Sequence, residues 1–369
     1  MPTSPRPFDD NSLDLIGRPF NAVDTPAVIV DLDVVEANVR RFQAYCDEHG
    51  LRLRPHIKTH KIPEFAALQM KAGAVGINCQ KIGEAEVMVD AGMSDILITF
   101  NILGAAKLAR LRRLAGRCAL TVTADSETVV AGLAEAMAGA ERPLDVLVEC
   151  DTGAGRCGVQ SPEAARDLAR RIAAMSPLRF KGLMTYPKAG AARAAADWLA
   201  KAKALCEEDG LPCPVVSSGG TPDMWGAGDL DTVTEYRVGT YIYNDRSLIA
   251  RKVCTVADCA LNVLATVVSR PTAGRAIIDA GSKALTSDLL GLDGHGFIPE
   301  LPEASIHALS EEHGFVDLGN GTGQPSVGDK IRVIPNHACV VSNLVDRVYA
   351  IRGGKVSGIL RVQARGCSQ

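Results

Sequence analysis

The sequence predicts an α/β protein that consists of a TIM-like (β/α)8 barrel and a mainly antiparallel β domain. Between Thr25 and Tyr243, short runs rich in β-branched residues alternate with helical stretches rich in Ala, Leu, Glu and Arg, which is the rhythm of βα units. After Tyr243, strand-like alternation broken by glycine-containing turns replaces this rhythm, as is typical of an antiparallel sheet.

Eight runs in the first part have the composition of strands, and eight is the number that a parallel barrel needs. They are Ala27–Asp33, Leu53–Lys58, Val75–Gln80, Asp95–Phe100, Ala119–Asp125, Leu144–Asp151, Phe180–Tyr186 and Pro214–Gly219. A doubly wound open sheet is the main rival. We favour the barrel because no G-x-G-x-x-G motif follows the first run.

The second part contains five further strand candidates and no long helical pattern. They are Val256–Ser269, Arg275–Asp279, Lys330–Pro335, Val345–Ile351 and Lys355–Val362. The stretch Gly281–Gly319 reads as a long connection, which indicates a functional segment or an interface. We therefore expect an N-terminal arm over residues 1–24, the barrel over residues 25–245 and the β domain over residues 246–369.

Composition narrows the class of protein. The chain has 369 residues, of which 47% are hydrophobic, so two domains with a large core are possible. A formal charge of -3 gives no sign of a nucleic-acid partner, and no apolar run reaches the ~20 residues that span a bilayer. The N-terminus lacks the apolar segment of a secretory signal, and the 11 cysteines show no C-x-x-C spacing. We expect a cytoplasmic protein without a disulfide framework.

One basic stretch is the strongest candidate for chemistry. After a short strand-like run the chain reads RPHIKTHK over residues 54–61. If the strand continues, its alternation places His56, Lys58 and His60 on one face. Neighbouring imidazolium groups or burial would lower the pKa of the Lys58 amine and make it a nucleophile. The alternative is a basic loop with two solvated histidines.

Other polar residues follow the ends of different predicted strands, where the active sites of (β/α)8 barrels lie. Gln80, Arg156 and Tyr186 have such positions, and so does the turn Ser217–Thr221. The amides and hydroxyls of a glycine-rich turn suit a phosphate, although such turns also form for steric reasons. Gly239, Thr240 and Tyr241 are candidates for a second set of phosphate contacts.

A candidate metal site lies in the second part of the chain. His337 and Cys339 follow the predicted strand Lys330–Pro335, and on an extended segment they would point to the same side. Imidazole and thiolate suit zinc and similar ions, and two ligands would leave coordination positions open for water or substrate. The alternative is a core cysteine beside a polar histidine.

These motifs carry a family resemblance. The segments TPAVIVDLD, RPHIKTHK, GINCQKIGEAE, ECDTGAGRCGV and DAGSKAL, which begin at Thr25, resemble the D-threonine aldolase and D-serine dehydratase family of pyridoxal-phosphate enzymes with the alanine-racemase-like fold. The resemblance continues to the C-terminus and implies that Lys58 forms the Schiff base with pyridoxal 5'-phosphate. It implies cofactor contacts for Tyr186, Thr221, Gly239 and Thr240. Arg156 resembles the arginine near the pyridine nitrogen, with a salt bridge to Asp151 or Glu149 as the alternative.

The resemblance also implies a divalent metal, Mn, Mg or Zn, on His337 and Cys339. D-Serine dehydratases of this family carry cysteine at the second position, whereas aldolases often carry aspartate. Many aldolases have Tyr-His-Gly where this chain has Tyr186, Pro187 and Lys188. The acid/base role would then pass to His60, to a metal-bound water or to Lys58 itself.

The function predicted from this resemblance is a D-threonine aldolase, which cleaves small D-3-hydroxy amino acids to glycine and an aldehyde. The alternative is a D-serine or D-3-hydroxyaspartate dehydratase that releases a keto acid and ammonia. A racemase would need an acid/base group on each face of the cofactor ring, and a non-catalytic cofactor carrier would need no metal site. The resemblance also implies a homodimer.

Overall fold

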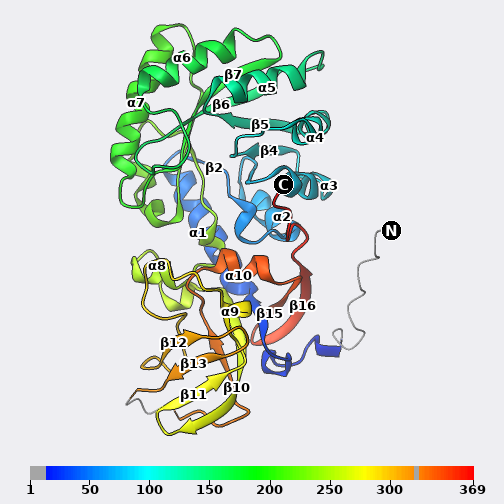
Figure 1. Cartoon of the computed structure of the whole chain (residues 1–369), viewed down its shortest axis with the longest axis vertical. Helices are drawn as coiled ribbons and strands as arrows, with labels where there is room; N and C mark the ends of the chain where they lie inside the picture. Colours follow the sequence, from blue (N-terminus) through cyan, green and yellow to red (C-terminus); the bar gives the residue numbers. More distant parts are fainter. Residues whose placement is uncertain (1–13, 320–323) are drawn as a thin grey trace. The chain divides into compact units, whose positions relative to one another are not determined.

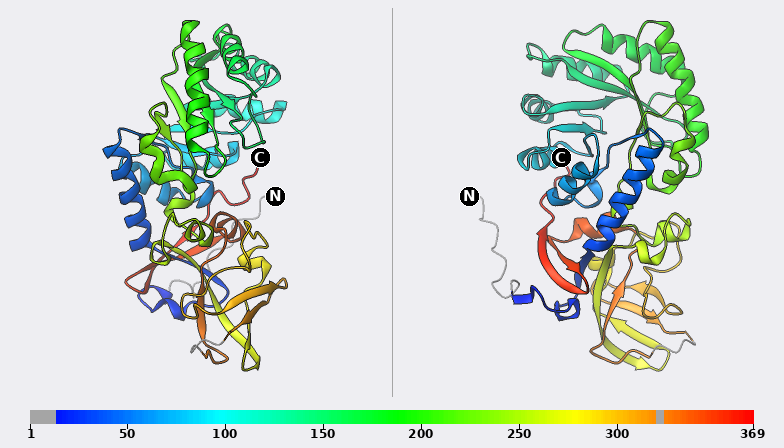
Figure 2. Two further views of the ribbon diagram at one scale, coloured as in Figure 1. Left: turned by 90° about the vertical axis from the view of Figure 1, so that its left-hand side faces the viewer. Right: turned by 180° about the vertical axis from the view of Figure 1, so that it is seen from behind.

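A computed structural model describes residues 14–319 and 324–369 (Figure 1). The chain forms two compact units. The β unit comprises the described residues up to Asn38 together with Ile242–Arg365, and the barrel unit comprises Val39–Tyr241 together with Gly366–Gln369. Helix α1 (Leu32–Glu48) begins in the first unit and ends in the second, and Figure 2 shows it as one continuous blue helix.

The barrel unit confirms the predicted fold class. Within the described part of the chain, eight parallel strands form a sheet with the order β2-β9-β8-β7-β6-β5-β4-β3. The sheet closes between its two end strands, because Val75 N–H donates to Leu53 O at 2.9 Å and Asn78 N–H donates to Pro55 O at 2.8 Å. The strands are β2 (Arg52–Leu53), β3 (Ile77–Cys79), β4 (Asp95–Ile98), β5 (Ala119–Ala124), β6 (Leu144–Cys150), β7 (Leu178–Thr185), β8 (Val215–Ser218) and β9 (Glu235–Tyr236).

Helices cover the outer side of this sheet (Figure 2). Helix α6 shows why they form: Ser161 Oγ caps its first turn by accepting from Ala164 N–H at 3.1 Å, and Pro162 occupies its first position. Its buried residues recur with helical spacing and face the sheet. The covering helices are α2 (Pro63–Ala72), α3 (Ile82–Asp90), α4 (Ala105–Ala115), α5 (Glu127–Met137), α6 (Pro162–Ala173) and α7 (Ala192–Glu208).

The barrel strands differ from the predicted set at one position. The run predicted as the first strand contains β1 (Ala27–Asp31), which pairs with β10 and β15 of the β unit, so its assignment to the barrel is wrong. The strand that completes the barrel is β9, between β8 and β2. The pattern missed β9 because it has only two residues, one of them the buried Glu235, which is paired with Arg54 at 2.8 Å. Lys58 therefore follows the first barrel strand, not the second.

The β unit is mainly antiparallel, as predicted. Among the described residues its sheet has the order β12-β13-β11-β10-β1-β15-β16, with β14 paired to β10, and only β1 and β15 run parallel within it. The further strands are β10 (Leu261–Thr272), β11 (Arg275–Ile278), β12 (Ser305–Leu309), β13 (Gly314–Asp317), β14 (Lys330–Val333), β15 (Arg347–Arg352) and β16 (Lys355–Arg361). Strands β12 and β13 lie in the stretch Gly281–Gly319, which the sequence analysis read as one long connection. Short helices accompany the sheet: α8 (Arg246–Ala250), α9 (Ser282–Leu285) and α10 (Ala338–Leu344).

The predicted N-terminal arm is described only from residue 14 onward, and residues 1–13 lie outside the described residues. The described part of the arm lies beside the start of β16, because Gly17 N–H donates to Val356 O at 2.8 Å and Phe20 N–H donates to Gly354 O at 3.0 Å. Among the described helices, none is both long and apolar enough to cross a membrane.

Candidate active site

Lys58 lies in a 3-10 turn directly after barrel strand β2. The turn, η3 (Ile57–Thr59), is anchored to the barrel because His56 N–H donates to Val238 O at 2.7 Å. The expectation of an extended segment with His56, Lys58 and His60 on one face is therefore wrong. A strand cannot form here because the backbone turns: His60 N–H and Lys61 N–H both donate to Ile57 O.

The two histidines of this stretch have different surroundings. His56 Nδ1 lies 3.4 Å from Lys58 N, and its Nε2 lies 3.0 Å from Gln80 Oε1. Burial and the positive charge of Lys58 hold the pKa of His56 well below its usual range, so the ring is neutral. His60 has no exposed surface, Ile62 N–H donates to its Nδ1 at 3.0 Å, and burial lowers its pKa to about 4.

The predicted base His60 is consequently enclosed in the barrel unit. Its Nε2 lies 3.3 Å from Gln69 Oε1, and the amide of Gln69 donates to the Tyr241 hydroxyl at 2.9 Å. Tyr241 is 1% exposed, and burial raises its pKa. His60 and Tyr241 are thus both buried within the barrel unit and linked through Gln69. Lys58 itself is half-buried.

The turns after β8 and β9 pack directly against each other and against η3. Arg237 N–H donates to Ser218 O at 2.8 Å, and a Cβ atom added at Gly219 would lie 2.4 Å from Arg237 O. A Cβ atom at Gly239 would lie 2.7 Å from Thr59 Oγ1. Glycine is required at both positions because the backbones approach so closely. The predicted residues Thr221, Gly239 and Thr240 therefore belong to two neighbouring turns of one barrel end.

Tyr186 and Arg156 meet after the ends of β7 and β6. Tyr186 is 40% exposed, and the Arg156 guanidinium carbon lies 4.9 Å from the centroid of its ring. A Cβ atom added at Gly220 would lie 3.4 Å from this ring, so the glycine-rich turn borders Tyr186. Asp151, one predicted ion-pair partner of Arg156, accepts from the N–H groups of Gly153 and Gly155 at 3.0 and 3.1 Å.

Arg237 is a site residue that the sequence analysis missed. It is fully buried after β9, and its guanidinium donates to Ser217 Oγ at 2.9 Å, to Asn78 Oδ1 at 3.3 Å and to Thr185 O. Burial lowers its pKa to about 10, so Arg237 stays a cation at neutral pH. Its position two residues before the candidate Gly239 could have indicated a site residue, but the short strand β9 that precedes it was not predicted.

Glu149 on β6 is a second buried charged residue that the prediction used only as an alternative partner for Arg156. It is 3% exposed, and Thr123 Oγ1 donates to its Oε2 at 3.4 Å. Burial raises its pKa, although the charges of Arg156 and Arg237 act in the opposite direction. The end of the barrel that carries Lys58 therefore contains the Lys58 amine, the guanidinium groups of Arg156 and Arg237, and the carboxyl groups of Glu149 and Asp151.

The predicted metal ligands lie at the start of α10 in the β unit. His337 is the residue before this helix and Cys339 belongs to its first turn, so the predicted extended geometry is wrong. The two side chains nevertheless interact, because Cys339 acts to raise the pKa of His337. His337 Nδ1 also lies 2.6 Å from Asp288 Oδ2. Burial lowers the pKa of His337, but its bonds to Cys339 and Asp288 prevail and raise it to about 9.

The backbone between the two predicted ligands is fixed as well. Ala338 N–H donates to Asp245 Oδ2 at 3.1 Å, and Asn336 Nδ2 donates to Gly294 O at 2.8 Å. Across residues 14–319 and 324–369, no group of three or more His, Cys, Asp or Glu side chains is arranged to hold a metal ion. A metal at this position would therefore have two protein ligands and open coordination positions.

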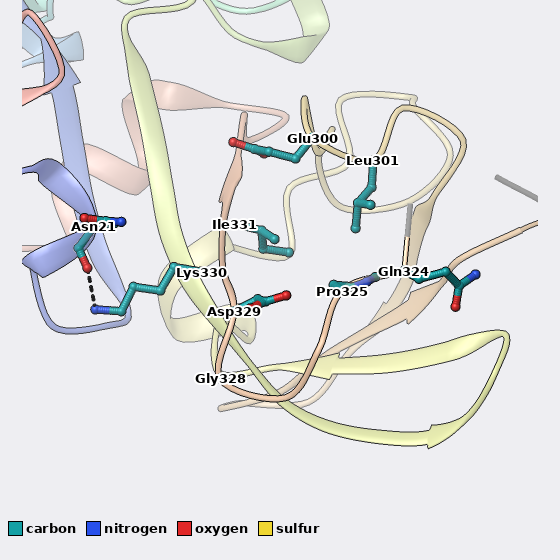
Figure 3. Close-up of a pocket in the computed structure, with 9 residues that line it drawn as sticks. All are labelled: Asn21, Glu300, Leu301, Gln324, Pro325, Gly328, Asp329, Lys330 and Ile331. Carbon is teal, nitrogen blue, oxygen red and sulfur yellow. Dashed lines mark hydrogen bonds between the residues drawn. The ribbon is translucent and has the colours of Figure 1, made fainter. Parts of the chain in front are cut away.

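A separate pocket lies in the β unit (Figure 3). Its volume is about 580 Å³. The described residues that line it include none of the predicted site residues. Lys330 Nζ at its wall donates to Asn21 O at 3.0 Å and to Val23 O at 2.6 Å. Glu300 is paired with Arg332 at 2.6 Å. These charged groups are satisfied within the protein, and we assign the pocket no function.

The comparisons with known proteins agree with this arrangement. Residues 30–247 match the family model of the alanine racemase N-terminal domain, and residues 260–351 match that of a serine dehydratase domain. A D-threonine aldolase from Arthrobacter sp is 36% identical over 96% of this chain and 96% of that protein.

The solved structures that this chain resembles include enzymes of the same two kinds, aldolases and dehydratases. The D-threonine aldolase of Filomicrobium marinum has a TM-score of 0.89 and 36% identity, and the match covers 96% of this chain and 99% of the other. The D-threo-3-hydroxyaspartate dehydratase of Delftia sp. HT23 has a TM-score of 0.84 and 30% identity, with 93% and 98% covered. A cysteine-to-alanine variant of D-threo-3-hydroxyaspartate dehydratase is described in a metal-free form. The chain belongs to the D-threonine aldolase and D-serine dehydratase-like family, whose members are lyases with the alanine-racemase fold.

Proposed function

We propose that this protein is a pyridoxal-phosphate-dependent D-threonine aldolase that cleaves D-3-hydroxy amino acids to glycine and an aldehyde. The observation that carries the proposal is 36% identity over 96% of the chain to a D-threonine aldolase. The position of Lys58 directly after a barrel strand supports it, because the active sites of such barrels lie at this end.

The residues at this end of the barrel fit the cofactor. Gly220 leaves space beside Tyr186, since a side chain at this position would meet the ring at 3.4 Å. Lys58 would hold the cofactor aldehyde, and Tyr186, Thr221, Gly239 and Thr240 would surround the phosphate. When bound, pyridoxal phosphate supplies an electron sink for a carbanion at the substrate Cα.

Two guanidinium groups would complete the cofactor site. Arg156 remains our candidate for the neighbourhood of the pyridine ring, because it already lies over Tyr186. Arg237 would add a buried positive charge that favours binding of the anionic cofactor. Gln80 would act indirectly, because its side chain holds His56 and Thr99 O.

A divalent metal, Mn, Mg or Zn, would be held by His337 and Cys339. The imidazole and thiol are two residues apart at the start of α10 and influence each other electrostatically, and this donor pair suits such ions. The metal would supply a Lewis acid that polarises the substrate hydroxyl.

Proton transfer is assigned to Lys58 Nζ. His60, the other candidate within the barrel unit, is fully buried and contacts Ile62 N–H and Gln69. In aldol cleavage Lys58 Nζ would receive the hydroxyl proton, and in a dehydration it would receive the Cα proton. Neutral His56 beside it would not compete as an acid.

Dehydration of D-serine or D-3-hydroxyaspartate is the second candidate function. Similarity to a D-threo-3-hydroxyaspartate dehydratase with 30% identity over 93% of the chain favours it, as do Cys339 and the absence of a histidine after Tyr186. The assay is incubation with D-threonine, with L-threonine as the control. Glycine and acetaldehyde would support the aldolase, whereas 2-oxobutanoate and ammonia alone would defeat it.

The cofactor assignment has its own test. Purified wild-type protein should absorb visible light, and Lys58→Ala should remove this absorbance, while the exposed Lys71→Ala variant should retain it. An unchanged spectrum of Lys58→Ala would reject the Schiff base at this residue. We also propose that the enzyme is a cytoplasmic homodimer, and light scattering of the purified protein would measure its mass.

A further inference from the structure

We propose that Asp288 positions the imidazole of His337 so that its Nε2 and the Cys339 thiolate face the metal ion. This inference rests on the metal-dependent function proposed above. It assigns a role to a residue that comes from a different segment of the β unit than the two metal ligands.

The contact between Asp288 and His337 is short and direct. His337 Nδ1 lies 2.6 Å from Asp288 Oδ2, and the side chains are 26% and 36% exposed, respectively. A hydrogen bond donated by Nδ1 leaves Nε2 as the nitrogen that binds a metal, which takes the place of the Nε2 proton. Metal-binding histidines commonly donate their other N–H to a carboxylate, which fixes the tautomer and the ring orientation.

The loop that presents Asp288 has an unfavourable backbone on both sides of it. Thr286, a β-branched residue, has a φ of 68°, and Leu290 has a φ of 48°. Such conformations are unfavourable for residues other than glycine and persist where the surrounding structure determines them. Here Thr286 Oγ1 accepts from Asp288 N–H at 3.1 Å, and Thr286 is buried at the end of α9. The backbone of Asp288 is thus held by a buried residue.

A second carboxylate holds the backbone of the same site. Asp245 is 1% exposed and accepts from Ala338 N–H at 3.1 Å, from Ser247 Oγ at 2.6 Å and from Leu248 N–H at 3.3 Å. Asp245 therefore fixes the chain between the two ligands, while Asp288 fixes the ring of His337. The backbone is independently held, so removal of Asp288 should free the ring without unfolding the turn.

Asp288 is better suited to position the histidine than to bind the metal itself. Its Oδ2 lies on the Nδ1 side of the ring, and Nε2 is on the opposite side. Within the described residues, no third acidic, thiol or imidazole group forms a metal cluster with His337 and Cys339. The structure therefore predicts a graded loss of affinity without Asp288, not an abolished site.

The experiment compares Asp288→Ala and Asp288→Asn with the wild type after removal of metal by EDTA. Binding of Mn²⁺ is measured by electron paramagnetic resonance, and binding of Zn²⁺ by competition with a chromophoric chelator. Glu300→Gln is the matched control, because Glu300 is also 36% exposed and paired with a cation at 2.6 Å. His337→Ala is the reference for a lost ligand.

We expect Asp288→Ala to raise the Kd for both ions by about 10- to 100-fold, as is usual when such an outer carboxylate is removed. Asp288→Asn should lose less, because its amide oxygen still accepts from Nδ1–H. Glu300→Gln should stay within about twofold of the wild type. With saturating Co²⁺, Asp288→Ala should keep the thiolate-to-cobalt charge-transfer band, because Cys339 remains a ligand. If Asp288→Ala does not fold, Asp288→Asn carries the same comparison.

Three results would overturn the proposal. A Kd of Asp288→Ala that matches the wild type would show that Asp288 does not act on the metal site. A loss as complete as in His337→Ala, or loss of the charge-transfer band, would show that Asp288 is itself part of the ligand set. No stoichiometric binding by the wild type would remove the proposed metal together with the role of Asp288, although the product assay with D-threonine would still test the aldolase.

Discussion

The substitution Gly239→Ala should disturb the lysine turn through steric overlap alone. An alanine Cβ at this position would lie 2.7 Å from Thr59 Oγ1 and 3.1 Å from His56 O. An ordinary contact requires a separation of about 3.4 Å, so Thr59 must move away by about 0.7 Å. Thr59 is 0% exposed and directly follows Lys58, so this movement displaces the turn that carries the amine.

Overpacking of this kind typically costs about 1–3 kcal/mol of unfolding free energy. Because misplacement of a reactive group by about 1 Å can reduce activity by about 10²-fold, we also expect a clear loss of activity and of cofactor affinity. Urea unfolding measures the first effect, and titration of apoenzyme with pyridoxal phosphate measures the second. Gly226→Ala is the matched control, because a Cβ there has no atom within 4 Å.

A double variant identifies the cause. Thr59→Ala removes Oγ1, so Gly239→Ala should cost less in a Thr59→Ala background than in the wild type. The contact with His56 O at 3.1 Å remains, so we expect partial rescue. If Gly239→Ala were as stable as the wild type and bound the cofactor equally well, the close packing of the two turns would be refuted. Equal costs in both backgrounds would refute the role of Thr59.

Three further predictions concern the barrel unit. Arg54→Met should lower the free energy of unfolding, measured in urea, by about 3–5 kcal/mol, because it leaves buried Glu235 without the guanidinium that lies 2.8 Å away. Adding Glu235→Gln to this variant should recover part of the loss. Burial acts to raise the pKa of Glu235, but the charge and hydrogen bond of Arg54 prevail and hold it below its ordinary value of 4.5. This pair therefore contributes its full stability above pH 4.5 and loses it as the pH falls through the lower folded pKa, so Glu235→Gln should flatten acid unfolding monitored by circular dichroism. Tyr186→Ala should raise the cofactor Kd about tenfold, which corresponds to about 1.4 kcal/mol of binding free energy. Tyr186→Phe keeps the ring under Arg156 and should lose less affinity. Equal affinities of both variants and the wild type would contradict the placement of this ring.

The barrel was predictable from its rhythm, but the identity of one strand was not. The apolar run of β1 is compatible with a barrel strand, and only pairing with distant residues such as Leu264 and Tyr349 assigns it to the other sheet. Strand β9 has the opposite problem. Its Glu235 is tolerated inside because Arg54, from the other end of the barrel sequence, neutralises it.

The site was predictable to the extent that its residues follow strand ends. Lys58, Tyr186 and Thr221 were proposed by this rule, and each follows a barrel strand in the structure. The local conformation around Lys58 was not predictable, because turn and strand patterns look alike over so short a stretch. Arg237 was missed together with its strand, and Asp288 was missed because it is 49 residues away from His337 in the chain.

The most direct measurement of the central claim is the covalent position of the cofactor. Reduction of the purified protein with borohydride, followed by peptide mass spectrometry, fixes pyridoxyl phosphate to the amine that holds it. We predict a single modified lysine, Lys58, in the peptide that contains Pro55 and His56. Modification of any other lysine, or an unmodified protein after incubation with the cofactor, would contradict the account.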